Sequence, residues 1–114
     1  MMEIPLRATA NQTLQTIVGD QNCSIRLYTR LTPLGDETVY IDLAVDQTNI
    51  FTGEPCMNGL PLPLYDYVEF TGKLMFIDLQ GSSAPQYYGL GSRWVLVYMD
   101  NAEQAQYREG TAYA

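Results

Sequence analysis

Alternation between apolar and polar residues constrains the fold of this chain more than any other feature. Residues 23–30 place Cys23, Ile25 and Leu27 on one side, and residues 38–46 repeat the pattern. Successive side chains of a β-strand point to opposite faces of the sheet, so a period of two predicts strands that bury one face. These two segments are therefore expected to be strands over a common core.

Other segments extend the pattern, and turn residues separate them. Residues 94–99 are apolar on both faces, which predicts the most buried strand of the fold. Hairpin turns are expected at residues 19–22 and 46–49. Further strands are expected at residues 12–18, 50–52, 67–70 and 73–79. About seven short antiparallel strands predict an all-β, single-domain β-barrel or sandwich.

Three stretches break the alternation. Residues 53–64 carry three prolines and should form extended edge chain or a long crossing loop, with Leu60, Leu62 and Leu64 packed down. Residues 80–92 read as a second long loop. Residues 100–114 read as an irregular tail with one helical turn after Asn101 as N-cap. We therefore expect a β-domain at residues 1–99 and a tail or short helix at 100–114.

Charge and length exclude several classes of function. The chain has 114 residues and a net charge of −7, which disfavours nucleic acid and anionic membrane as partners. No apolar run approaches the roughly 20 residues of a membrane span. The N-terminus also lacks the pattern of a secretory signal.

The chain contains no histidine, so the commonest general base and metal ligand is missing. Cys23 and Cys56 are too few and too far apart for a structural zinc site, and no calcium-binding spacing is present. We expect neither a metal nor a cofactor. We expect the two cysteines to be free thiols in a reducing cytoplasm. The alternative, a disulfide, requires their Cα atoms to lie within about 7 Å of each other.

Two patterns could indicate catalysis, and each has a simpler reading. Carboxylates such as Asp42, Asp46 and Asp78 could form a hydrolase pair, but the first two fall on the polar face of a strand. Gly89-Leu90-Gly91-Ser92 resembles a phosphate loop, yet it leads into a strand and no lysine follows. We interpret it as a flexible connection and predict no catalytic residues.

Tyrosine is abundant, with nine residues. Tyrosine is enriched in protein interfaces, although it also suits ordinary strands. The tyrosines of the second loop and the tail have no evident core to enter. The interface candidates are Tyr87, Tyr88, Arg93, Tyr107 and Tyr113. The alternative is a small-ligand or carbohydrate-binding domain that uses Trp94 and the tyrosines as a stacking platform.

An ordered set of motifs resembles a known family. The most specific are Asp78-Leu79-Gln80-Gly81 and Gly89-Leu90-Gly91-Ser92-Arg93. Ile4-Pro5-Leu6 and Tyr40-Ile41-Asp42-Leu43 precede them. The chain resembles the baseplate plug family of contractile-tailed bacteriophages from about residue 4 to residue 99. It departs at Asp46-Gln47, where the family pattern leads us to expect Asp-Gly.

The resemblance implies a structural, non-enzymatic protein of the virion, made in the host cytoplasm and placed in the tail baseplate. The implied partners are the hub and spike proteins, the tail tube proteins and further copies of the chain with three-fold symmetry. It implies no active-site residues.

Overall fold

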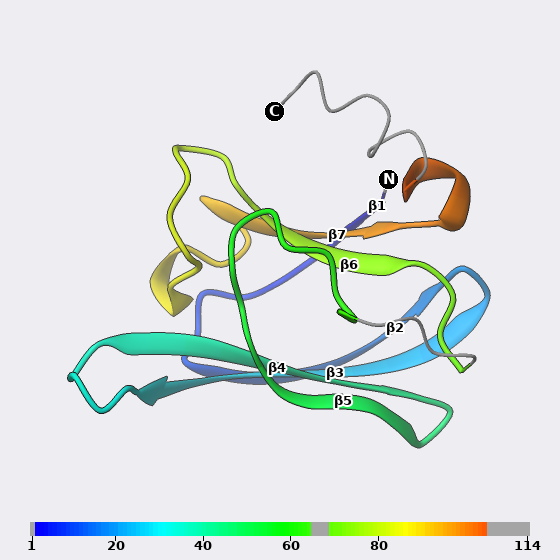
Figure 1. The fold of residues 1–114 in the computed structure, drawn as a ribbon, viewed down its shortest axis with the longest axis horizontal. Coiled ribbons are helices and arrows are strands. Elements are labelled where there is room, and N and C mark those ends of the chain that lie inside the picture. The colour runs from blue at the N-terminus through cyan, green and yellow to red at the C-terminus, as the bar shows by residue number, and fades with distance from the viewer. Residues whose placement is uncertain (1, 65–68, 105–114) are drawn as a thin grey trace.

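A computed structural model of the protein describes residues 2–64 and 69–104. In this part of the chain two antiparallel sheets stack face to face (Figure 1). The four-stranded sheet has the order β2 (Asn11–Val18), β3 (Gln21–Leu31), β4 (Glu37–Val45), β5 (Thr48–Pro55). The three-stranded sheet has the order β1 (Met2–Ile4), β7 (Trp94–Met99), β6 (Lys73–Asp78). The predicted all-β fold is confirmed, and of the two architectures it is the sandwich, not a closed barrel.

The hairpins of the four-stranded sheet turn in two residues. Gly19 and Asp20 have φ values of 56° and 59°, and Asp46 and Gln47 have 49° and 70°. Positive φ at both central residues is the signature of the type I′ turn, whose twist matches that of paired strands. The predicted turns are therefore correct in place but shorter than expected, because β3 begins at Gln21 and β5 at Thr48.

The core lies between the sheets. Ile25 and Leu27 from β3 and Ile41 and Leu43 from β4 are all buried, as the alternation predicts. β7 is buried along its whole length. One face of β7 packs into the core between the sheets, and its opposite face packs with Met75 of β6 in a second apolar cluster. This confirms that residues 94–99 form the most buried strand.

The segment 53–64 differs from the expected loop. β5 continues through Pro55, where a missing N–H costs little because this strand lies at the edge of the sheet. The chain then crosses to the other sheet, where Asn58 and Leu62 bridge to β6. Leu62 packs down as predicted, but Leu64 is exposed.

The remaining expectations concern the ends of the domain and residues 67–70. β1 was not predicted. Residues 67 and 68 of the strand expected at 67–70 lie outside the described residues, and so does the whole tail beyond residue 104. Residues 101–104 are helical, and the cap is Asp100 instead of Asn101. Asp100 Oδ1 accepts from the Glu103 N–H, and the Glu103 carboxylate accepts from the Asp100 N–H, which is a capping box.

Candidate protein-interaction site

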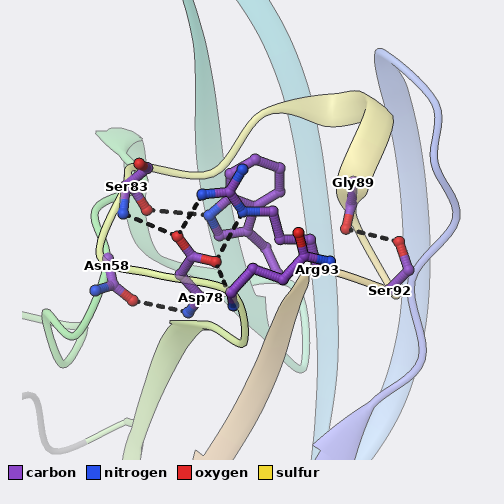
Figure 2. Close-up of polar contacts among 8 residues, drawn as sticks. Asn58, Asp78, Ser83, Gly89, Ser92 and Arg93 are labelled. Carbon is purple, nitrogen blue, oxygen red and sulfur yellow. Dashed lines mark hydrogen bonds and ion pairs between the residues drawn. The ribbon is translucent and has the colours of Figure 1, made fainter.

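One ion pair closes the base of the loop at residues 80–92. Asp78 ends β6 and Arg93 precedes β7, so residues from the two ends of the loop meet (Figure 2). Arg93 donates from Nε and Nη2 to the two carboxylate oxygens of Asp78, at 2.8 and 2.9 Å. Such bidentate pairing fixes geometry as well as adding attraction.

The Asp78 carboxylate also organises the chain that follows it. It accepts hydrogen bonds from the backbone N–H groups of Gln80 and Ser83, each at 2.9 Å. Its side chain is 0% exposed. The Arg93 bond, helped by these two N–H groups and opposed by desolvation, holds the pKa of Asp78 well below its usual range. The carboxylate is therefore ionised and fully engaged at neutral pH, and it cannot serve as a general acid there.

Trp94 supports the loop from below. It is 1% exposed, and its Nε1 donates to the Ser83 carbonyl at 3.0 Å. The Arg93 guanidinium lies over its ring, 4.4 Å from the centroid. The Asp78 N–H donates to Asn58 Oδ1 at 2.8 Å and so ties in the crossing segment. We call Asn58, Asp78, Ser83, Arg93 and Trp94 the loop clamp.

The glycines near the end of the loop are required by close contacts. A Cβ at Gly89 would lie 2.4 Å from the Trp94 ring. Gly91 has a φ of 87°, and a Cβ there would lie 2.5 Å from the Leu6 carbonyl oxygen. Residues 89–92 connect to β7 as predicted, and their backbone packs closely against the Trp94 ring at Gly89 and against the chain after β1 at Gly91.

The clamp presents two tyrosines from the short 3₁₀ helix η1 (Tyr87–Gly89). Tyr88 is 63% exposed and rests edge-on against Trp94, with ring centroids 5.9 Å apart. Tyr87 is half-buried against the core. Gln86 Nε2 donates to the Glu37 carbonyl at 3.1 Å, which joins the loop to the start of β4.

The β3–β4 hairpin projects from the same end of the sandwich (Figure 1, left). Its tip is ordered by hydrogen bonds from the Thr32 N–H to the Asp36 carbonyl and from the Gly35 N–H to the Thr32 carbonyl. Leu34, at the tip, is 90% exposed, and Leu31 and Leu79 are exposed beside the ends of β3 and β6. We call this end of the sandwich, where Leu31, Leu34, Leu79 and Tyr88 are exposed, the loop end. Exposed apolar side chains on a rigid scaffold are typical of interaction sites.

The structure brings together three of the predicted interface residues, Tyr87, Tyr88 and Arg93. Arg93 points inward to Asp78, and its role is to hold the loop. Tyr107 and Tyr113 lie outside the described residues. Sequence reasoning missed the leucines, although an apolar residue between Pro33 and Gly35 in a turn was an available signal.

The alternative of a stacking platform conflicts with the structure, because Trp94 is buried beneath the loop. A surface hollow of about 430 Å³ lies beside the start of β2, and no acidic side chain lines it. Asp42 accepts hydrogen bonds from the Tyr28 hydroxyl and the Gly53 N–H, so it is not free to pair with a second carboxylate.

Other site chemistry is also limited within residues 2–64 and 69–104. No cluster of three or more potential metal-ligating side chains occurs there. Both cysteines are free and buried, and burial, with Asp46 nearby, raises the pKa of Cys23 to about 11. Among these residues no helix has the length and apolar character needed to cross a membrane.

Comparison with known protein families gives a match over residues 1–102 to the family described as Cyanophage baseplate Pam3 plug gp18. Comparison with curated proteins finds no match. The family match spans both sheets and the entire loop clamp, and it agrees with the resemblance seen in the sequence.

Proposed function

Because the chain belongs to this family of phage baseplate plug proteins, we propose that it is a structural part of the tail baseplate that closes the end of the tail tube through protein–protein contacts. Its place of action is then the virion, after synthesis in the host cytoplasm. The chain acts without catalysis in this proposal, in keeping with the engaged carboxylates and buried thiols of the described residues.

The loop end is the observation that carries the proposal. Leu34 and Tyr88 expose large apolar side chains on segments that hydrogen bonds hold in place. A rigid segment loses little conformational freedom when it binds, so its contacts contribute more fully to affinity. The loop end is therefore suited to seat the domain against a neighbouring protein.

The partners in this proposal are the hub and spike proteins and the tail tube proteins. Three-fold self-association within the baseplate is part of the same proposal and derives from the family resemblance. A small-ligand or carbohydrate-binding function has less support, because the aromatic residue at the centre of that alternative is buried.

A co-purification experiment tests the proposal. The chain is co-expressed with the hub protein of its own phage, and Leu34→Asp and Tyr88→Asp are introduced together. Central aromatic and apolar anchors typically contribute 2 kcal/mol or more, so binding should weaken by roughly 30-fold or more. The matched control is Thr52→Asp, an exposed change on β5 away from the loop end.

The melting temperature of each variant separates lost binding from lost folding. The expected result is a folded double variant that no longer carries the hub protein, beside a control that does. A folded double variant that still binds the hub protein would contradict the proposal that the loop end is the contact surface.

A further inference from the structure

The sheet edges of the sandwich are protected to very different degrees. β5 is broken by register shifts and contains Gly53, Glu54 and Pro55. The outer edge of β6 is covered by bridges from Asn58 and Leu62. β1 has three residues and is followed by a proline. Proteins normally block exposed edges with such devices, because open backbone groups pair with other chains.

β2 has none of these devices. It runs for 8 residues without charge, proline, glycine or register shift, and it lies at the edge of the four-stranded sheet. Ile17, on its outward-facing side, is also exposed. Among the described strands, β2 is therefore the long edge that stands open.

The hairpin geometry shows which backbone groups of β2 are open. In a two-residue hairpin the residues flanking the turn, here Val18 and Gln21, form a hydrogen-bonded pair. Hydrogen-bonded and non-hydrogen-bonded pairs alternate along an antiparallel ladder. The N–H and C=O groups that point away from β3 therefore belong to Asn11, Thr13, Gln15 and Ile17.

We propose that two copies of the free protein pair through this edge, with the two β2 strands antiparallel and symmetric about Leu14. Asn11 then lies opposite the partner copy's Ile17, and Thr13 opposite the partner copy's Gln15. The Asn11 carbonyl accepts from the Thr9 hydroxyl at 3.0 Å but has a second lone pair, and each of the other outward groups of one copy meets an open group of the other. Because all four residues lie on the same face, the two sheets join with their polar and apolar faces aligned.

Charge favours a second copy as the occupant of this edge. Two chains of net charge −7 repel over most of their surfaces, but residues 8–19 carry no charge. Arg7 and Asp20 flank this neutral run on its two sides, and both are exposed. The antiparallel arrangement sets Arg7 of each copy at the end of the strand where the partner copy carries Asp20. The pairing thus adds attraction at both ends of the contact.

This contact is two-fold and belongs to the free protein. It is separate from the loop end, and it does not depend on the proposed role in the baseplate. Either proposal can therefore fail without the other.

Sedimentation of the purified full chain over a range of concentrations is the first test. The wild type should pass from monomer to dimer as its concentration rises. Gln15→Pro removes an outward N–H and leaves the ladder to β3 intact, so we expect at least about a tenfold weaker dimer with an unchanged fold. Gln15→Thr keeps that N–H and is the matched control, which should dimerise like the wild type.

Cysteine cross-linking tests the register. Residues directly opposite in a hydrogen-bonded pair have Cα atoms about 5.5 Å apart, within the range of a disulfide. A mixture of Thr13→Cys and Gln15→Cys chains should therefore oxidise to a cross-linked dimer faster than either variant alone, while buried Cys23 and Cys56 stay unreacted.

A wild type that remains monomeric at high concentration would overturn the proposal. So would a dimer that the folded Gln15→Pro variant forms equally well, since that result assigns the contact to another surface. Cross-linking of each variant with itself, but not of the mixture, would overturn the register about Leu14.

Discussion

The two ends of the sandwich are built on the same strands but differ in chemistry and construction (Figure 1). At the loop end, long connections expose Leu34 and Tyr88, and the connection that carries Tyr88 depends on the loop clamp. The opposite end, which we call the turn end, holds the two type I′ turns and the exposed Asp20, Asp46, Glu69 and Asp100. The backbone hydrogen bonds of a two-residue turn are made within the hairpin, so the turn's side chains are free to carry charge. A long loop must instead bury side chains to hold its shape.

The largest effect on stability should follow from removing the Trp94 side chain, which packs beneath the loop at residues 80–92. Trp94→Ala opens a cavity under the loop and removes the bond to Ser83, so the free energy of unfolding should fall by about 3–5 kcal/mol. Urea unfolding followed by circular dichroism measures the loss. Trp94→Phe keeps most of the packing and should cost about 1–2 kcal/mol. A loss below about 1 kcal/mol for Trp94→Ala would show that the loop end does not depend on its clamp.

Asp78→Asn should have the next largest effect, with a characteristic pH dependence. The pKa of Asp78 in the folded protein lies below its ordinary value of 3.8, so the carboxylate contributes its full stability above that value. The contribution is lost as the pH falls below 3.8 toward the folded pKa. The gap in melting temperature between wild type and Asp78→Asn should thus be constant near neutral pH and shrink in acid. A gap that does not change in acid would contradict this account of the ion pair.

Two glycines at the loop end separate backbone strain from crowding. Gly35 has a φ of 89° and open space around it, so Gly35→Ala should cost about 1–2 kcal/mol from the left-handed backbone alone. Gly91→Ala adds an overlap with the Leu6 carbonyl oxygen and should cost at least about 1 kcal/mol more. If chemical unfolding gave equal losses of unfolding free energy for the two variants, the chain after β1 would be able to move away from the added methyl group without cost.

The smallest effect should occur at the turn end and should be a gain. Gln47 has a φ of 70°, a conformation that glycine adopts without steric cost. Gln47→Gly should therefore raise the free energy of unfolding by about 0.5–1 kcal/mol, measured by chemical unfolding. Gln47→Ala, which keeps a Cβ, should show no such gain. A destabilised glycine variant would show that the Gln47 side chain makes an important contribution to the turn.

Much of the fold was predictable because it follows from local patterns. β3 and β4 bury one face each, and β7 buries both, so hydrophobic periodicity identifies them directly. β1 escaped prediction because three residues are too few to show a period, and because its partner lies at the far end of the domain.

The candidate site was only partly predictable, because its contacts join separate segments. Asp78 and Arg93 stood out in the sequence as members of two motifs, but nothing in their spacing shows that they meet. The exposure of Leu34 depends on how far the β3–β4 hairpin projects beyond the other sheet. Both facts belong to the assembled sandwich and not to any one segment.

The pairing of β1 with β7 has a consequence for how the protein is made. Met2 lies opposite Tyr98, and β7 is the shared neighbour of β1 and β6. All four strands of the larger sheet precede β7 in the chain, so they are synthesised before the strand that joins the covering layer. The apolar face of that sheet therefore stays incompletely covered until β7 has been made, and during this time aggregation competes with folding. A chain that stops before Trp94 leaves its first strand without a partner, so the sandwich cannot close until β7 has been made.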